Sequence, residues 1–463
     1  MAEKVSPADI GDGTQFRREI GVFGGVSIIG GIMIGSGIFY LGSFVLQRTG
    51  MSMGLALVCW VVGGVVSLLG GLCFAELGAA RPKAGGMVVY LNEAYHPMVG
   101  FLDGFCSWLL SGAGSIAAVA IAIPTALSSF LEISELSVKI IAIFLVVGLT
   151  IYNYFGVKLG SVLQNVSMVA KLIPILLIMT GALVFGKESP NLSLAPAVGG
   201  PVSFGKMIGM IAFGTLATLW AYEGWTNLNT VTEEMKNPKR NLPAALVITL
   251  VGITILYTLF NYSIYRMIPQ EEVISIIEGG NLYLGTEVAK RIFGAAGGTI
   301  VLVGMMISMF GCLNGMILAF PRAYYAMGLE GHFFKAYGTL HPKYKIPAVS
   351  LIGQCVISCV LITLRSLDQL TSLVVFISML FNLMVVVAVI IYRKKYPDLE
   401  RPYKVWGYPF TVIVSIILFL ALALNTLLED PATALIGLVV PAIGVLFYIY
   451  FDREKKRVKA VKK

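Results

Sequence analysis

Long apolar runs separated by short polar stretches dominate the pattern of this chain. A membrane-spanning helix needs about 20 mainly apolar residues, because in hydrocarbon its backbone polar groups bond only within the helix. The polar stretches at 81–97 and 270–291 retain apolar residues, which predicts short helices at the membrane surface. Twelve longer runs are predicted to span, at residues 20–46, 52–80, 98–131, 136–155, 160–185, 206–231, 242–265, 292–320, 347–364, 367–392, 408–428 and 432–451. The pattern therefore predicts an all-α integral membrane protein with twelve transmembrane helices.

The composition agrees with this prediction. Of 463 residues, 57% are hydrophobic and 13% charged, and the mean hydropathy is +0.84, too apolar for a soluble globular protein. No polar stretch is long enough for a separate domain, so residues 1–463 are predicted to form one transmembrane domain. Residues 1–19 are expected to be a cytosolic N-terminus, since no cleavage site of small residues accompanies the first run. Residues 452–463 form a basic tail.

The net charge of +9 is explained by membrane topology. If both termini are cytoplasmic, most of the 34 lysines and arginines fall in cytoplasmic loops and in the tail, as the positive-inside rule requires. This bias predicts a multi-pass protein of the cell membrane with an even number of spans. A nucleic acid partner is not needed to account for the charge.

The six cysteines all lie in or beside apolar runs, where cysteine behaves as a small hydrophobic residue. No disulfide is expected from this distribution. The outer loop after the third predicted span, ALSSFLEISEL, contains no cysteine that would attach a second subunit covalently. We therefore expect the protein to work as a single subunit.

The first run contains the segment GGIMIGSGIFYLG at residues 30–42. Gly31 and Gly35 have the spacing of a packing face for another helix, which is the commoner role of glycine in a spanning helix. Gly35, Ser36 and Gly37 are consecutive, however, and point all around the helix axis, which favours a local unwinding. The amides that begin the outer half-helix would then suit a carboxylate, and the carbonyls near Met33 and Ile34 an ammonium.

The sixth run contains a matching interruption, FGTLATLWAYEGW at residues 213–225, with Gly214 and Gly224 around a polar aromatic cluster. Transporters with inverted repeats carry such paired interruptions near mid-membrane. We therefore predict repeats at 20–185 and 206–392, with two further helices at 408–451. The backbone carbonyls of this break are expected to join the binding site, at Trp220, Ala221, Tyr222 and Glu223.

Lys171 lies near the middle of the fifth run, too deep for its side chain to reach either membrane surface. A charge there costs at least about 2.5 kcal/mol even on the lowest insertion scale, so the ammonium should face a polar cavity or oxygen partners. The alternatives are a neutral lysine in a packed interior and a purely structural link between helices. Ser308, Cys312 and Asn314 form a short polar stripe that is predicted either to contact Lys171 or to bond ordinarily between helices.

Two carboxylates lie close to the interior of predicted spans. Glu76 is near Arg81 and Lys83 in the sequence and is expected to pair with them. Glu223 lies at the second interruption, where either its carbonyl or its side chain can line the site. Trp220, Tyr222 and Trp225 have spacings that force at least one ring off the packed face, and a Trp beside a binding site can serve as a gate.

Several motifs in order resemble one family. GSGIF, CFAELG with RPKAGG and YLNEAY, AKLIP, WAYEGW, and FGCLNG followed by PRAYYAMGLEGHFF are similar to the L-type amino acid transporters of the amino acid, polyamine and organocation superfamily. The resemblance covers the first ten predicted spans. It is strongest to bacterial members that exchange small neutral amino acids such as alanine, serine, threonine and cysteine.

The resemblance implies a LeuT-type fold of 5+5 inverted repeats with helices 1 and 6 unwound. It implies carboxylate binding at Ser36 and Gly37, and amine binding at the carbonyls of Met33, Trp220 and Glu223, with Trp220 as an aromatic gate. It also implies that Lys171 occupies the place of a sodium ion in distant relatives, which would make exchange sodium-independent.

This chain departs from the animal members in two respects. The outer-loop cysteine that bonds their accessory glycoprotein is missing, so no disulfide-linked heavy chain is expected. Glu223 stands where they have glycine, which leaves size selectivity and proton coupling open. Trp220 stands where phenylalanine is common, which narrows the pocket towards small substrates. A proton-coupled symporter that uses Lys171 or Glu223 is an alternative, and a non-transporting amino acid sensor is a more distant one.

An enzymatic function is not indicated. GMSMG at residues 50–54 matches the spacing of a hydrolase nucleophile motif, but that motif needs a strand before its turn, and here it opens a membrane helix. The three histidines lie in loops, and the sequence has no HExxH, phosphate-binding loop or Cys/His cluster. We expect no catalytic residue, no metal and no cofactor.

Overall fold

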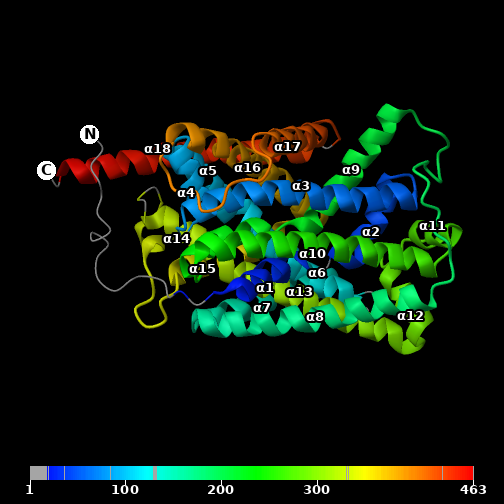
Figure 1. The fold of residues 1–463 in the computed structure, drawn as a ribbon. Helices are drawn as coiled ribbons and strands as arrows, with labels where there is room; N and C mark the ends of the chain where they lie inside the picture. The colour runs from blue at the N-terminus through cyan, green and yellow to red at the C-terminus, as the bar shows by residue number, and fades with distance from the viewer. Residues whose placement is uncertain are drawn as a thin grey trace.

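The computed structural model describes residue 18 and residues 20–35, 37–83, 85–128, 133–329, 331, 333–365, 367–429 and 431–461. Long helices run side by side along one direction (Figure 1). One end of the bundle, here called the inner end, carries α4, α14 and the end of α18, and the opposite, outer end carries α11 and α12.

The helical elements follow one another with short connections. In order they are α1 (Val22–Met33), α2 (Gly37–Arg48), α3 (Met53–Ala80), α4 (Met87–Ala94), α5 (Pro97–Cys106), the π-helix η2 (Ser107–Ser111), α6 (Gly112–Ser128), α7 (Glu135–Tyr154), α8 (Val157–Phe185), α9 (Phe204–Tyr222), the 3-10 helix η3 (Trp225–Glu234), α10 (Pro238–Met267), α11 (Gln270–Glu278), α12 (Leu284–Phe293), α13 (Ala295–Ala319), α14 (Pro321–Leu329), the 3-10 helix η4 (Lys335–Gly338), α15 (Ala348–Leu364), α16 (Leu367–Lys395), α17 (Phe410–Glu429) and α18 (Pro431–Val461).

The all-helical membrane architecture predicted from the sequence is confirmed. Within the described part of the chain, ten helices are long and apolar enough to span a membrane, and the bent pair α1 and α2 makes eleven. α15 is apolar but has only 17 residues, at the lower limit for a span. The count of twelve therefore depends on α15 and stays a prediction. The short helices expected at 81–97 and 270–291 are α4, α11 and α12.

Local chemistry explains where many of these helices begin. Ser52, Ser134 and Ser203 cap α3, α7 and α9, each accepting a hydrogen bond from a backbone amide three residues later. α5 and α10 carry proline in the first turn, where its missing N–H costs nothing. α18 continues past the predicted end of its apolar run, because the charged tail residues are good helix formers.

The helices differ strongly in burial, which locates the core. In the apolar window of the span that contains α6, 78% of residues are buried, against 22% for α7 and 28% for α18. α1, α3 and α13 also lie in the interior, whereas α7, α8, α17 and α18 expose large apolar side chains, as expected for lipid-facing helices. The first interrupted helix therefore begins in the interior, whereas the span of α9 and η3 is only 33% buried in its apolar window and exposes Phe204 and Ile208.

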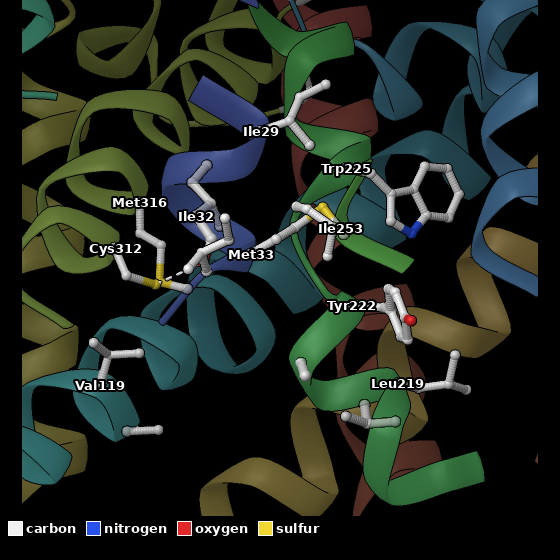
Figure 2. Packing of buried hydrophobic residues seen from close by; sticks show 14 of the residues in the cluster. Ile29, Ile32, Met33, Val119, Leu219, Tyr222, Trp225, Ile253, Cys312 and Met316 are labelled. Atoms are coloured by element: carbon white, nitrogen blue, oxygen red, sulfur yellow. Dashed lines mark hydrogen bonds between the residues drawn. The ribbon is translucent and has the colours of Figure 1, made fainter. Parts of the chain in front are cut away.

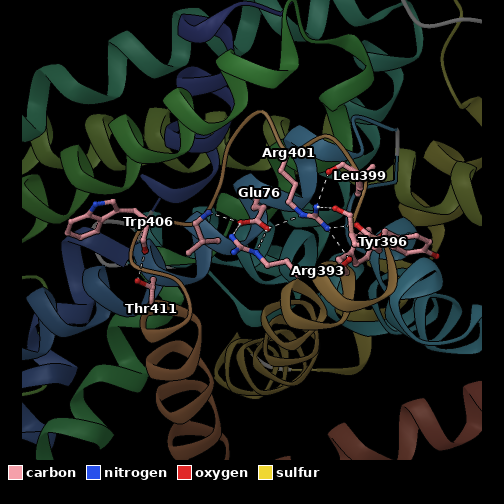
Figure 3. Close-up of polar contacts among 10 residues, drawn as sticks. Glu76, Arg393, Tyr396, Leu399, Arg401, Trp406 and Thr411 are labelled. Atoms are coloured by element: carbon pink, nitrogen blue, oxygen red, sulfur yellow. Dashed lines mark hydrogen bonds and ion pairs between the residues drawn. The ribbon is translucent and has the colours of Figure 1, made fainter.

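A buried ion-pair network ties the connection after α16 to α3 (Figure 3). The Glu76 carboxylate accepts hydrogen bonds from Arg393 at 2.9 and 2.6 Å and from the Val405 amide at 2.6 Å, and Arg401 lies 3.7 Å away. The expected pairing of Glu76 with nearby basic residues was wrong. Arg81 and Lys83 instead pair with Glu93, because the chain turns into α4 directly after them.

We expect Glu76→Ala to destabilise the protein substantially. Glu76 is only 2% exposed and Arg393 22%, so the change leaves arginines near the interior without a counter-charge. Breaking a buried ion pair costs ~3–5 kcal/mol, and the partial exposure of Arg393 favours the lower part of that range. A thermal unfolding scan of the detergent-solubilised protein would show a lower midpoint.

Glu400→Ala is the matched control for this prediction. Glu400 pairs with Lys239, but it is 74% exposed, so its loss should leave the unfolding midpoint almost unchanged. Equal midpoints for Glu76→Ala and Glu400→Ala would show that the network contributes nothing to stability.

Candidate functional site: two interrupted helices beside a buried lysine

The first helix interruption lies between α1 and α2. α1 ends at Met33, α2 begins at Gly37, and the two axes differ in direction by 50°. The Gly35 amide bonds to the Met33 carbonyl, which is a tight turn and not a helical contact. Ser36, which we predicted to bind a carboxylate, lies outside the described residues. The position of the break agrees with the glycine pattern.

Lys171 of α8 is fully buried and binds the end of α1. Its Nζ donates to the carbonyls of Gly31 at 2.7 Å and Ile34 at 2.6 Å. The last carbonyls of a helix lack partners within the helix and carry partial negative charge, so they suit an ammonium. Ser308 of α13 donates to the same Ile34 carbonyl at 2.8 Å. Ser308 and Lys171 therefore share an acceptor at the end of α1, and the hydrogen bond of Ser308 is of the ordinary interhelical kind that the sequence left open.

Two further side chains complete the hydrogen bonding of α1. Cys312, on the same face of α13 as Ser308, donates its thiol to the Ile32 carbonyl at 2.8 Å. The Tyr257 hydroxyl of α10 lies 2.7 Å from the Met33 carbonyl and 3.2 Å from the Ala221 carbonyl of α9. Tyr257 thus connects the two interrupted helices.

Our sequence analysis missed Tyr257. The available signal was a polar stripe inside the apolar run at 242–265, because Thr254, Tyr257 and Asn261 recur at helical spacing. Such a stripe indicates a polar face towards other helices, but it does not identify the partner.

The protein's own donors already use two of the carbonyls that we predicted to bind an ammonium. The Ile34 carbonyl receives hydrogen bonds from Lys171 and Ser308, and the Met33 carbonyl from Tyr257 and the Gly35 amide. A carbonyl oxygen has two lone pairs, so both are filled. The break is thus stabilised without a ligand.

The second interruption follows α9. α9 ends at Tyr222, the Glu223 amide bonds back to the Trp220 carbonyl at 3.3 Å, and η3 begins at Trp225. Gly224 has φ +126°, a conformation that residues with a side chain rarely adopt. A Cβ at Gly224 would also lie 2.5 Å from Cγ2 of Ile32 in α1. Glycine is therefore required both for the turn and for the approach of the two breaks.

The aromatic residues of the second break point in different directions. Tyr222 donates its hydroxyl to the Trp60 carbonyl of α3 at 2.9 Å, and Trp225 packs edge-on against Phe74 with ring centroids 4.8 Å apart. Both rings point away from Cys312 and Met316 (Figure 2). Trp220 instead is half-buried and faces a cavity. Of the three rings, only Trp220 is placed for the predicted gating role.

A small central cavity of about 20 Å³ lies between the two breaks. Six of the nine predicted substrate-binding residues line it. Ile34 and Tyr222 are not among the lining residues, because the Ile34 carbonyl faces Lys171 and the Tyr222 ring packs on α3. The lining residues of this central cavity are Ile32, Met33, Gly35, Gly37, Val119, Trp220, Ala221, Glu223, Cys312 and Met316.

An inner cavity of about 80 Å³ continues from the central one and shares Ile32, Glu223 and Met316 with it. Its wall mixes apolar with polar side chains and includes Asp103, a carboxylate that our sequence analysis did not select. The π-helix η2 contributes Ser107 and Ser111 to the same wall, and such widened turns often occur at functional sites.

A third, outer cavity of about 380 Å³ lies on the same two scaffold helices. It touches Ala126 of α6 and Met305 of α13, seven residues from Val119 and Cys312 of the central cavity. Seven residues of helix span about 10 Å. Outer, central and inner cavities are therefore arranged in sequence along one side of α6 and α13.

Comparison with known proteins agrees with this architecture. The model of the amino acid permease family matches residues 20–448. The chain is 31% identical to the serine/threonine exchanger SteT of Bacillus subtilis (strain 168) over 446 residues, which cover 95% of this chain and 98% of that protein.

Animal transporters are similar to the same extent. The chain is 31% identical to the b(0,+)-type amino acid transporter 1 of Mus musculus over 95% of this chain and 88% of the relative. It is 30% identical to the human cystine/glutamate transporter over 96% and 87%. These are membrane transporters and not enzymes, and the resemblance found in the sequence motifs is confirmed. The chain belongs to the amino acid permease family, among relatives of the L-type amino acid transporters.

Proposed function

We propose that this protein is a sodium-independent exchanger of small neutral L-amino acids that works by alternating access. The observation that carries the proposal is that both interrupted helix ends and Glu223 border one small cavity, with Lys171 bound directly behind it. An amino acid has one cationic and one anionic group, and a broken helix offers a partial charge of each sign. The named exchanger among the relatives, for serine and threonine, supports this substrate class.

In this proposal the substrate carboxylate binds the amides that begin α2, at Ser36 and Gly37. The ammonium binds carbonyls that face the central cavity, at Met33, Trp220, Ala221 and Glu223. Because the Met33 carbonyl already accepts two hydrogen bonds, the incoming ammonium takes the place of one protein donor there. Gly35 keeps the backbone open for this approach, and Ile34 supports the site from behind through Lys171.

Sodium independence follows in this proposal from Lys171 and Ser308. The oxygens of Gly31 and Ile34, with the Ser308 hydroxyl, form an oxygen-rich position of the kind that a monovalent cation uses, and the Lys171 ammonium fills it. Because this cation is part of the protein, no sodium ion has to bind there, and exchange does not depend on a sodium gradient.

The small size of the substrate is supported by the central cavity. Its volume of about 20 Å³ has room for about one water molecule, so any substrate requires the wall to move in this conformation. Val119, Met316 and Trp220 contribute large apolar groups to that wall, which favours a small substrate side chain. Trp220 is proposed as the gate that closes over a bound amino acid.

Alternating access would join the central cavity to the inner and the outer cavity in turn. We propose two repeats at 20–185 and 206–392. The elements at the start of each repeat, which are α1, α2, α3, α9, η3 and α10, move together against the remaining helices. At the inner end, Arg322 of α14 binds Glu234 of η3 at 2.6 Å, so opening there requires this contact between the two groups to break. Ile20 pairs with the segment after η3, a contact inside the moving group that can stay intact.

The proposed setting is the cell membrane, with both termini in the cytoplasm and a single working subunit. The distribution of Lys and Arg supports this orientation. The missing outer-loop cysteine supports a protein without a covalently bound partner. One relative, from Mus musculus, is named large neutral amino acids transporter small subunit 2, and that name describes a protein that works in an assembly.

Counterflow in proteoliposomes tests the proposal. Vesicles loaded with unlabelled serine should accumulate labelled alanine and serine from outside, equally with and without sodium, and should accumulate labelled leucine and arginine much less. A requirement for a sodium gradient, or accumulation without internal substrate, would contradict exchange. Saturable binding without any accumulation would indicate a sensor instead.

Proton-coupled symport is the second candidate, because Glu223 is a carboxylate that lines both the central and the inner cavity. For an exchanger we expect Glu223→Gln, which keeps the shape and the hydrogen bond to Ser378, to change the exchange rate by less than about tenfold. Uptake that an inward proton gradient drives in the wild type and not in Glu223→Gln would favour symport. Thr226→Ser, a conservative change beside the same cavity, is the control.

A further inference from the structure

The outer cavity carries charged groups that the proposed transport site does not use. Its wall consists of the turn after α11, the start of α12, and the outer parts of α6 and α13 (Figure 1). Glu287 and Lys290 are its charged residues, and Asn281 and Thr286 its uncharged polar side chains besides Tyr283. Apolar surface comes from Ala126, Leu282 and Met305.

The two charged groups of the wall form an ion pair with each other. Lys290 Nζ lies 2.9 Å from Glu287 Oε1, and the amide group of Asn281 donates to the same oxygen at 3.2 Å. Lys290 is 50% exposed and Glu287 25%, and ion pairs at such exposed positions contribute little stability. A ligand that offers an ammonium to Glu287 and a carboxylate to Lys290 can therefore replace this pair at low cost.

The volume of the outer cavity indicates a broader choice of side chain. At about 380 Å³ it is far larger than the central cavity of about 20 Å³, and it lies within the range of small-molecule pockets. Apolar residues beside the charged pair give a long side chain a place to pack.

The cavity is also connected to the outer half of the first interrupted span. Ser43 of α2 donates its hydroxyl to the Leu282 carbonyl at 2.7 Å, and the rings of Tyr40 and Tyr283 meet edge-on with centroids 6.3 Å apart. A movement of α2 therefore moves one wall of the outer cavity.

We infer that the outer cavity is a second amino acid site, in which Glu287 binds the α-ammonium group and Lys290 the α-carboxylate of a substrate before it enters the central cavity. The ligand class is an L-amino acid zwitterion with little restriction on side-chain size. The inference rests on the proposed transport function for the identity of the ligand, but the site is distinct from the transport site. The contacts of Ser43 and Tyr40 with its wall make its occupancy sensitive to the position of α2.

Asymmetric kinetics distinguish this site from the central one. In intact cells, Glu287→Gln and Lys290→Gln should each raise the external KM for serine by about fivefold, as the loss of one weak ionic contact implies. In inside-out vesicles the KM at the inner side should stay at the wild-type value, because the inner path does not include the outer cavity.

The matched controls are Glu135→Gln and Lys139→Gln. These residues form another exposed ion pair with the same charges, at the start of α7 and away from the outer cavity. They should leave both KM values unchanged. An unchanged external KM in Glu287→Gln and Lys290→Gln, or equal increases on both sides of the membrane, would overturn the inference.

Direct binding separates failure of this inference from failure of the proposed function. Purified Lys171→Met protein, in which transport should be strongly reduced, is expected to bind labelled leucine saturably, and the added change Lys290→Gln should weaken that binding by about fivefold. Absence of leucine binding to Lys171→Met would overturn the outer site while leaving exchange by the wild type untouched. Absence of counterflow by the wild type would contradict the proposed function and leave the leucine measurement valid.

Discussion

Lys171→Met is expected to reduce amino acid exchange by about 10- to 100-fold while the protein still inserts and folds. The change removes an ammonium that binds the carbonyls of Gly31 and Ile34. Hydrogen bonds to a charged group contribute roughly 1.5–3 kcal/mol, and each 1.4 kcal/mol corresponds to a factor of ten. Without them the end of α1 loses its attachment to α8. Counterflow in proteoliposomes, normalised to inserted protein, measures the effect.

Two further variants make this prediction specific. Ser308→Ala removes only the second donor to the Ile34 carbonyl, so the loss of exchange should be smaller than for Lys171→Met. Lys171→Arg keeps the charge, but the guanidinium is larger and planar, so it cannot bind both carbonyls as the compact lysine ammonium does. Exchange should therefore stay low. Wild-type exchange by Lys171→Met would show that the lysine is only a structural link.

Gly224→Ala is expected to impair exchange and lower thermal stability together. The φ of +126° at Gly224 disfavours any side chain, which costs about 1–3 kcal/mol. The new Cβ would in addition lie 2.5 Å from Ile32 Cγ2 and push η3 away from α1. The central cavity lies between these two elements, so counterflow should fall by at least about tenfold. The thermal unfolding midpoint should fall as well.

Gly252→Ala is the matched control, because Gly252 lies in the helix α10 with no atom within 4 Å of the added Cβ. It should leave both measurements near wild type. The double change Ile32→Ala and Gly224→Ala removes the clash but keeps the unfavourable φ, so it should recover part of the loss. Equal counterflow and equal unfolding midpoints for Gly224→Ala and Gly252→Ala would show that exchange and stability do not depend on the backbone conformation of Gly224.

The sequence by itself determined the all-helical membrane architecture, and its glycines predicted where the first and sixth spans are interrupted. A bilayer offers no water to the backbone, so each long apolar run has to form a helix whatever lies beside it. The consecutive small residues from Gly35 to Gly37 weaken the first span locally, and the glycine after Glu223 weakens the sixth. For the same reason a lysine in mid-membrane had to bind oxygen atoms, which correctly indicated a polar environment for Lys171.

The sequence did not identify the partners of these groups. Glu76 illustrates the limit: its basic neighbours in the sequence were the obvious partners, but it binds Arg393, which lies 317 residues away. Tyr257 bonds to Met33 across 224 residues and was missed. No periodicity in a single run encodes such contacts, since they depend on how finished helices pack.

Only the tertiary structure decided which predicted residues face the same space. It directed the Ile34 carbonyl to Lys171 and the Tyr222 ring to α3, and it left Met33, Trp220 and Glu223 beside the central cavity. It also arranged three cavities along α6 and α13. The physical reason is the range of the interactions. Whether a helix forms or is interrupted is decided within a few residues. The direction of a carbonyl or a ring is decided by the helices packed against that group, which come from distant parts of the chain.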